Sequence, residues 1–190
     1  IEKIKQAVEK YEPVAVQKDL LEEYTQEAGV LVALYEERNS LQIILTRRSP
    51  HLSTHAHQVS FPGGHHEKVD KDLWSTALRE AHEETGLDPS LPKKIGELDP
   101  IVTVGSGTLI YPFVALLPHR PELKANSAEV ETIRHVDLAE LLKEETWREE
   151  YWEREERSHA VTFFEIPNET IWGATANILR QLLTLGLGIV

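Results

Sequence analysis

Residues Gly63 to Leu87 have the sequence GGHHEKVDKDLWSTALREAHEETGL, and this stretch decides the fold and the chemistry that we expect. Glu80, Glu83 and Glu84 are related by i, i+3 and i+4 spacing, so a helix places them on one face. Like charges at that spacing repel, and a hard divalent cation such as Mg²⁺ offsets the repulsion while bridging substrate phosphates. The spacing therefore indicates a metal site, with a solvated acidic helix face as the alternative.

A glycine turn precedes this helix. Gln58 to Gly64 alternates like a strand until Pro62 and two glycines break it. A Gly-Gly pair lets the backbone approach a ligand or a metal without a side chain in the way. Gly86 is a natural C-cap, and the face opposite the glutamates carries a predicted buried stripe of Trp74, Ala77, Leu78 and Ala81. The order of strand, glycine loop and carboxylate helix predicts a metal site for a phosphate-containing substrate.

This segment resembles the Nudix box, a pattern of Gly, five residues, Glu, seven residues, then Arg-Glu-apolar-x-Glu-Glu-x-Gly-apolar. The second half of the pattern fits from Arg79 to Leu87. In the first half, counting back from Arg79 places Lys71 where the general pattern has Glu, and the nearest acid, Asp70, lies one position earlier, with eight residues rather than seven between it and Arg79. That one-residue stretch is similar to the coenzyme A pyrophosphatase branch of the superfamily.

Three further stretches resemble the same branch. Ile44 to Gly64 is similar to its signature of Thr-x-Arg-Ser and then Leu-Arg-x-His-x-Gly-Gln-Val-x-Phe-Pro-Gly-Gly, except that Ser53 replaces the usual Arg and His57 the usual Gly. The other two stretches are Ser106-Gly107 with Pro112, and IWGATA from Ile171 to Ala176. The resemblance covers roughly residues 28 to 185.

The resemblance implies an α/β/α sandwich with a mixed β-sheet, a fold that the mixture of strands and helices along the chain also favours. It implies a hydrolase that uses Mg²⁺ or Mn²⁺ to split coenzyme A or acyl-CoA into 3′,5′-ADP and 4′-phosphopantetheine. One alternative is hydrolysis of another nucleoside diphosphate derivative, such as ADP-ribose, NADH or a dinucleotide. The other is a non-catalytic Nudix domain for ligand sensing or interaction.

The resemblance also assigns roles to individual residues. The expected metal ligands are Glu80, Glu83, Glu84 and the carbonyl of Gly64 or Gly63. The general base is a box glutamate, Glu83 or Glu84, or a later carboxylate, Glu129, with Glu131 as its neighbour. Substrate contacts are expected from Arg47, Arg48 and His55. Structural roles fall to Arg79, Gly63 and Gly86, with Arg79 orienting a box glutamate through a bidentate pair.

Composition agrees with this interpretation. The chain has 190 residues, a formal net charge of −12 and no cysteine. That length predicts one domain over residues 1–190, with an N-terminal helix and connector over 1–27. The negative charge disfavours a nucleic-acid partner, the lack of cysteine is consistent with a cytoplasmic location, and no segment is apolar enough to cross a bilayer. We expect a CoA-like small-molecule substrate, with a homodimer left open.

Periodicity predicts the remaining elements. A first helix, with Ile4, Ala7, Val8 and Tyr11 on one side, ends before Pro13, and Pro13 to Gln26 is a connector. The expected strands are Ala28–Glu37, Leu41–Arg48, one around Ile95–Val104, Leu109–Leu117, Glu129–Val136 and Ala160–Ile166. The expected helices are Asp137–Glu144, a solvated one over Trp147–Arg157 with i, i+4 charge pairs, and Thr170–Leu185.

Overall fold

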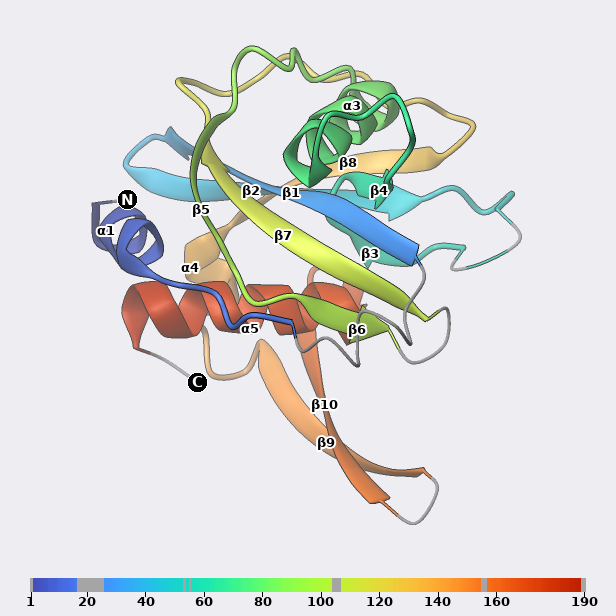
Figure 1. Cartoon of the computed structure of the whole chain (residues 1–190). Helices are drawn as coiled ribbons and strands as arrows, with labels where there is room; N and C mark the ends of the chain where they lie inside the picture. Colours follow the sequence, from blue (N-terminus) through green and yellow to red (C-terminus); the bar gives the residue numbers. More distant parts are fainter. Residues whose placement is uncertain are drawn as a thin grey trace.

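A mixed eight-stranded sheet forms the centre of the protein (Figure 1). The computed structural model describes residues 2–16, 26–52, 54, 56–103, 107–154 and 157–188. The sheet follows the order β3-β2-β1-β7-β5, with β4 paired to β1, β6 to β7 and β8 to β2. Strands β1 and β7 run parallel, whereas the other pairs are antiparallel, so the predicted mixed sheet is confirmed. The strands are β1 (Gln26–Glu37), β2 (Ser40–Arg48), β3 (Val59–Ser60), β4 (Gly63–His65), β5 (Lys93–Glu97), β6 (Ile101–Thr103), β7 (Thr108–Leu116) and β8 (Val130–Asp137).

Helices cover both faces of this sheet, which confirms the sandwich. Helix α3 (Leu73–Thr85) lies on one face, and α1 (Glu2–Lys10) and α5 (Gly173–Leu187) lie on the other (Figure 1). Strand β1 serves both layers, because its successive side chains point to opposite faces. Val30, Val32 and Leu34 pack in the core under α5, and Leu31, Ala33 and Tyr35 pack in the core under α3.

A smaller sheet extends from the body on the side of α5. It consists of β9 (Trp147–Arg154), β10 (Arg157–Ile166) and β11 (Glu169–Trp172), in the order β11-β10-β9. Its base is buried, since Phe164 and Ile171 are both fully covered. The β9–β10 hairpin then projects away from the rest of the molecule (Figure 1). The short helix α4 (Leu138–Leu141) joins the two sheets.

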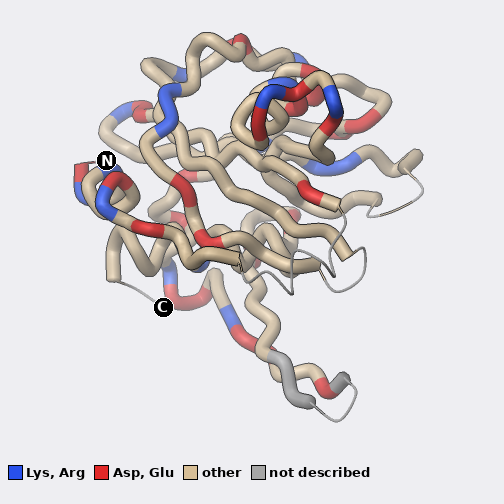
Figure 2. Tube along the Cα trace, viewed as in Figure 1, with Lys and Arg blue, Asp and Glu red and all other residues tan. Residues whose placement is uncertain are grey.

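Helix α3 has the local signals that define its ends. Asp72 caps the N-terminus by accepting from the Ser75 N–H at 2.7 Å, and the Ser75 hydroxyl completes a capping box. Gly86 ends the helix in the left-handed conformation with φ 68°, as predicted. Ala77 and Ala81 are fully buried, while Trp74 and Leu78 are only partly covered. Figure 2 shows acidic and basic positions side by side along α3 and the loop before it.

The β9–β10 hairpin shows that one prediction was wrong. The segment Trp147–Arg157 was expected to be a solvated helix, but β9 occupies Trp147–Arg154 and pairs antiparallel with β10. Exposed i, i+4 charge pairs contribute only about 0.3–0.5 kcal/mol each, which does not compete with eight paired positions on an apolar neighbouring strand.

Three smaller differences concern where elements end. Residues Thr170 to Trp172 belong to β11, so the last helix begins only at Gly173, whose φ of 65° lies outside the helical range. The expected strand around Ile95–Val104 is two strands, β5 and β6, separated at Leu98–Pro100. The helix expected over Asp137–Glu144 covers only Leu138–Leu141. Most of the predicted connector, residues 17–25, lies outside the described residues.

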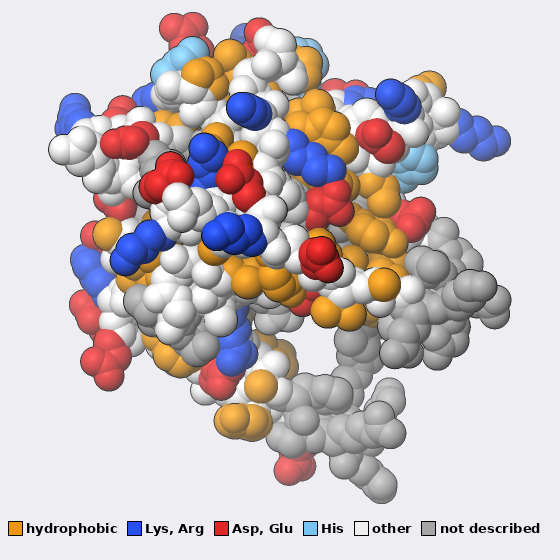
Figure 3. All heavy atoms as spheres, turned by 60° about the vertical axis from the view of Figure 1, so that its left-hand side comes forward, with side chains coloured by type: hydrophobic (Ala, Val, Ile, Leu, Met, Phe, Trp, Pro, Cys, Tyr) orange, Lys and Arg blue, Asp and Glu red, His pale blue; other side chains and the backbone are white. Residues whose placement is uncertain are grey.

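Charge is spread over the surface. On the face shown in Figure 3, Lys and Arg side chains are interspersed with Asp and Glu, so no basic patch covers that face. None of the helices in the described part of the chain is both long and apolar enough to span a membrane.

Candidate active site

The three box glutamates share one face of α3 but differ in burial. Glu84 is only 4% exposed, and its Oε2 accepts a hydrogen bond from the Gly63 N–H at 3.2 Å. The Glu80 side chain is 15% exposed and that of Glu83 is 51% exposed. Two carboxylates are therefore held inside the protein, and the third reaches solvent.

The two glycines of strand β4 lie directly against these carboxylates. It pairs with β1 through Gly63 opposite Val30 and Gly64 opposite Gly29. A Cβ at Gly64 would lie 2.5 Å from the carboxylate carbon of Glu80, closer than side-chain contacts allow. Only glycine lets the strand backbone and the Glu80 carboxylate lie this close together. The predicted turn thus serves close approach to a carboxylate.

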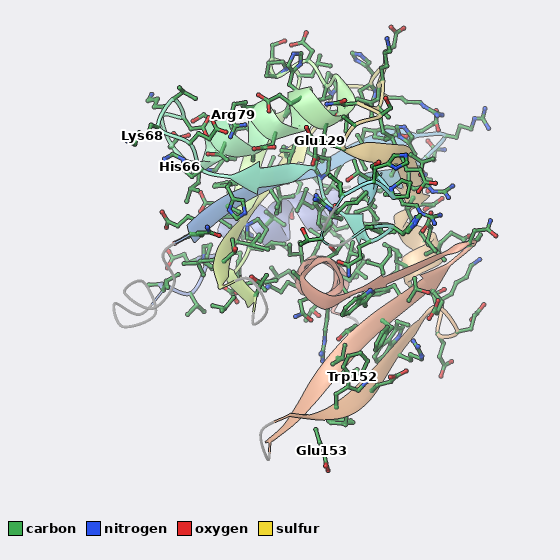
Figure 4. The ribbon with its side chains drawn as sticks, turned by 90° about the vertical axis from the view of Figure 1, so that its right-hand side faces the viewer. His66, Lys68, Arg79, Glu129, Trp152 and Glu153 are labelled. Atoms are coloured by element: carbon green, nitrogen blue, oxygen red, sulfur yellow. The ribbon has the colours of Figure 1, made fainter. Side chains whose placement is uncertain are left out.

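Arg79 joins the loop before α3 to the helix. Its Nε and Nη2 donate to the two carboxylate oxygens of Asp70 at 2.9 and 3.0 Å, a bidentate pair. Its Nη1 donates to Glu80 at 2.8 Å and to Glu83 at 3.2 Å. The bidentate partner is therefore Asp70 rather than a box glutamate, and the glutamates receive single bonds from the same guanidinium. Figure 4 shows Arg79 on α3 above the loop that carries His66 and Lys68.

Glu129 is brought to the site by a loop anchored on the end of α3. The Lys124 N–H donates to the Thr85 carbonyl at 2.8 Å, and the Asn126 N–H donates to the Glu84 carbonyl at 2.9 Å. The Glu129 carbonyl in turn accepts from the Ser49 N–H at 2.8 Å, just beyond β2. These bonds fix Glu129 beside the helix that carries Glu80 and Glu84 (Figure 4).

Burial dominates the electrostatics of this carboxylate group. It raises the pKa of Glu84 to about 8, with Glu80 and Glu129 adding to the shift and the Gly63 N–H and Arg48 opposing it. Burial also raises the pKa of Glu80, against the opposing contact with Arg79. Negative charge on Glu84 is thus disfavoured by its surroundings, because the effect of burial outweighs that of Arg48. A bound divalent cation would provide the positive charge that stabilises these carboxylates in their ionised form.

The available side chains fit a metal ion whose coordination shell is completed by oxygens of other groups. Within the described ranges, no three His, Asp or Glu side chains lie close enough together to hold an ion by themselves. Glu80 and Glu84 both lie against the Gly63–Gly64 backbone. Mg²⁺ commonly binds through one or two carboxylates plus substrate phosphates and water, so this incomplete protein shell is the kind it uses.

Arg47 and Arg48 end β2 in different surroundings. Arg47 Nε lies 3.1 Å from Glu131 Oε2, and its Nη1 lies 3.4 Å from Glu169 Oε1. The Arg48 side chain borders the cleft described below, and its buried Nε has no hydrogen-bond partner among the described residues. A buried donor without a partner is uncommon in a folded protein, and Arg47 Nε also makes no hydrogen bond by geometry, although it lies at ion-pair distance from Glu131.

The signature stretch before β3 departs from the family pattern at His57. Its φ of 63° is left-handed, the conformation that the glycine usual in the signature adopts freely. The ring lies 3.5 Å from Glu131 and 3.4 Å from Arg47, so His57 joins their ion pair. Ser53, the predicted substrate contact His55, and Ser106 lie outside the described residues.

A cleft of about 1300 Å³ opens from this site. One end is lined by Gly63, Gly64 and Arg48, and the other by Trp152 and Trp172 of the smaller sheet. This second wall was missed, because the segment of Trp152 was predicted as helix. Asp70 was noticed only as an acid out of register with the general pattern; its position one residue from the expected glutamate was the available signal.

Buried carboxylates on a helix, a glycine strand against them and an α/β/α sandwich together define the Nudix class. The family model for the NUDIX domain matches residues 25–157, and the chain belongs to this family. It is 41% identical over 140 residues to "Uncharacterized Nudix hydrolase NudL" of Photorhabdus laumondii, covering 74% of each chain. It is 40% identical over 165 residues to "Nudix hydrolase 22, chloroplastic" of Arabidopsis thaliana, covering 83% of this chain and 54% of that protein. The chain thus spans about half the length of the Arabidopsis relative.

Solved structures agree on the fold. A MutT/nudix family protein from Enterococcus faecalis is similar with a TM-score of 0.57 and 14% identity, covering 96% of this chain and 67% of that one. The NUDIX domain of Shewanella oneidensis NrtR complexed with ADP ribose has a TM-score of 0.50 and 19% identity, covering 72% of this chain and 84% of that one. At these identities the likeness concerns the fold alone.

Proposed function

We propose that this chain is a divalent-cation-dependent hydrolase of nucleoside diphosphate derivatives, with coenzyme A or acyl-CoA as its substrate. The observation that carries the hydrolase proposal is the buried pair Glu80 and Glu84, held against the Gly63–Gly64 backbone with a raised pKa at both carboxyls. A purely structural or binding role gives no reason to bury two carboxylates that repel each other. This weighs against a non-catalytic domain.

The proposed roles follow from burial and position. Glu80, Glu84 and the Gly64 carbonyl would hold Mg²⁺ or Mn²⁺, with the exposed Glu83 on the solvent side. The chemistry that such an ion would supply is neutralisation of charge on the diphosphate. Arg79 and Asp70 position Glu80. Glu129 is our choice for the general base, since it lies beside the metal ligands without being tied to Arg79; Glu83 and Glu84 remain the alternatives. Glu131 is paired with Arg47 and His57 instead.

The reaction places water against one of two anionic phosphorus atoms. Its oxygen bonds to phosphorus, its proton passes to the base, and the bridging P–O bond breaks to release a phosphate monoester. For coenzyme A, the products are 3′,5′-ADP and 4′-phosphopantetheine. Arg48, with its unpartnered Nε, is the proposed contact to the substrate anion. Arg47, already held by Glu131 and Glu169, is assigned to holding β2 in place.

The coenzyme A assignment rests on the resemblance of residues 44–64, 106–112 and 171–176 to one branch of the family. Another nucleoside diphosphate derivative remains the second candidate, because Ser53 lacks the charge of the arginine usual there. The proposed partner is a small molecule, with neither nucleic acid nor membrane. A cytoplasmic location stays a prediction, as the Arabidopsis relatives are named chloroplastic and mitochondrial.

A substrate panel tests the proposal. Coenzyme A, dephospho-CoA, ADP-ribose, NADH and a diadenosine polyphosphate are compared by kcat/KM with Mg²⁺ and with a chelator, for wild type and Arg48→Ala. We expect coenzyme A to be the best substrate and the chelator to abolish turnover. Because a charge-assisted hydrogen bond contributes about 1.5–3 kcal/mol, Arg48→Ala is expected to raise KM for coenzyme A about tenfold or more.

The comparison with dephospho-CoA locates the Arg48 contact. A larger increase in KM for coenzyme A than for dephospho-CoA places Arg48 at the 3′-phosphate, and equal increases place it at the diphosphate. Lys3→Ala, which removes an exposed charge on α1, is the matched control and is expected to change neither. Faster turnover of ADP-ribose than of coenzyme A by the wild type overturns the substrate assignment.

A further inference from the structure

The cleft extends from Gly63, Gly64 and Arg48 to the projecting hairpin, farther than a diphosphate requires. Its far end is lined by Trp152 and Val161 of the hairpin together with Trp172 and Ala174, the latter two at the junction of β11 and α5. Figure 4 places Trp152 on the hairpin, on the opposite side of the molecule from Glu129. One continuous cleft therefore joins Arg48 and the two glycines that contact Glu80 and Glu84 to an aromatic end.

The aromatic end leaves large apolar surfaces uncovered. Trp152 is 47% exposed and Trp172 is 40% exposed, and their ring centroids lie 6.4 Å apart. Trp152 also packs against Phe163, with 5.9 Å between ring centroids, so its ring is held in place. Its Nε1 already donates to Glu150 at 2.9 Å. What Trp152 offers to the cleft is accordingly an apolar ring face with no hydrogen bond left to make.

The charged side chains that line the cleft are also divided between its two ends. Arg48 is the only lysine or arginine among the described residues that line it, and it lies at the same end as Gly63 and Gly64. Glu153 lines the hairpin end. A second anionic group at that end would meet an acid and no cation, whereas an uncharged apolar group would cover ring surface that now faces water.

We propose that Trp152 and Trp172 form a subsite for the acyl chain of an acyl-CoA, so that they set the chain-length preference of the enzyme. This inference rests on the proposed hydrolysis of coenzyme A, and it names the part of the substrate that the hairpin recognises. The diphosphate lies at Glu80 and Glu84 with Arg48 beside it, and the chain runs along the apolar wall. Each methylene buried there adds binding energy.

The test is a chain-length series. Turnover of coenzyme A and its acetyl, butyryl, octanoyl and lauroyl thioesters is measured for wild type, Trp152→Ala and Trp172→Ala. We expect wild-type kcat/KM to rise about tenfold or more from coenzyme A to octanoyl-CoA, and the ratio between them to fall about tenfold in each variant. Calorimetric titration of the octanoyl thioester into Glu84→Gln, alone and combined with Trp152→Ala, measures the same contact without turnover.

Tyr151 supplies the matched control. It lies on the same strand and is 71% exposed, but it does not line the cleft, so Tyr151→Ala is expected to keep the wild-type chain-length profile. A wild type that hydrolyses coenzyme A with a flat profile overturns the acyl subsite and leaves the proposed function standing. An enzyme with no activity on any thioester or on coenzyme A overturns the proposed function itself. A flat profile together with a halved solution mass in both Tyr151→Ala and Trp152→Ala assigns the hairpin to self-association instead.

Discussion

Glu84 and Asp70 show that the partner of a buried carboxylate decides its charge. Both side chains are almost fully covered, at 4% exposure for Glu84 and 3% for the Asp70 side chain. Arg79 donates two hydrogen bonds to Asp70 and keeps the pKa of that carboxyl well below its ordinary value. Glu84 accepts a hydrogen bond from the Gly63 N–H, and burial raises its pKa to about 8. Sequence spacing grouped the glutamates correctly, but it gave no measure of how deeply each one is buried.

This difference predicts how pH affects stability without metal. The folded pKa of Glu84 is raised from 4.5 to about 8, so the folded protein binds the extra proton between those values. Its contribution to stability is present below about pH 4.5 and is lost as pH rises through about 8, with a slope of up to about 1.4 kcal/mol per pH unit. Thermal unfolding in a chelator is compared for wild type and Glu84→Gln from pH 5 to 9. The melting temperature of the wild type should fall relative to the variant; parallel curves would mean that Glu84 ionises normally.

Individual elements show where sequence patterns succeed and where they do not. The Gly86 C-cap of α3 and the apolar runs of β1 and β2 are local signals, and the structure confirms them. Strand β9 depends instead on β10, a partner that spacing within the segment does not reveal. The position of Glu129 also depends on a contact outside its own segment, because a loop hydrogen-bonded to the end of α3 places it in the site. Contacts between elements, rather than patterns within one, fix these parts.

Substitutions at two glycines, Gly64 beside the Glu80 carboxylate and Gly86 at the C-terminus of α3, should affect turnover and stability separately. Gly64→Ala would drive a methyl group into the Glu80 carboxylate, the flexible end of a side chain, so we expect turnover to fall about 10²-fold with little change in stability. Gly86→Ala has room for its methyl group, with no contact nearer than 3.6 Å, but forces alanine to φ 68°. It should lower the free energy of unfolding by about 1–2 kcal/mol and spare turnover. Steady-state kinetics and denaturant unfolding of both variants measure this; equal losses of activity would contradict it.

At the scale of the whole molecule, the two sheets and the helices around them bring the glycine strand of the proposed metal site and the exposed tryptophans to one cleft. The carboxylates come from α3 on one face of the main sheet, and the tryptophans come from the smaller sheet beside α5. The fold class and the carboxylate face were predictable because the box motif is short and contiguous in sequence. The cleft was not, since its walls come from segments about 90 residues apart that meet where β11 and α5 dock against β3. There the Thr175 hydroxyl donates to the Val59 carbonyl at 3.0 Å.

The most direct test of the central claim is the turnover of coenzyme A with Mg²⁺ by wild type and Glu84→Gln, measured side by side with and without a chelator. If Glu84 holds the catalytic ion, the variant should lose at least ~10²-fold in kcat while remaining folded, and the chelator should abolish wild-type activity. Glu9→Gln, a neutralised glutamate on the exposed side of α1, should behave as wild type. Wild-type-like turnover by Glu84→Gln, or hydrolysis that survives the chelator, would show that the carboxylate face of α3 is not a metal-dependent centre.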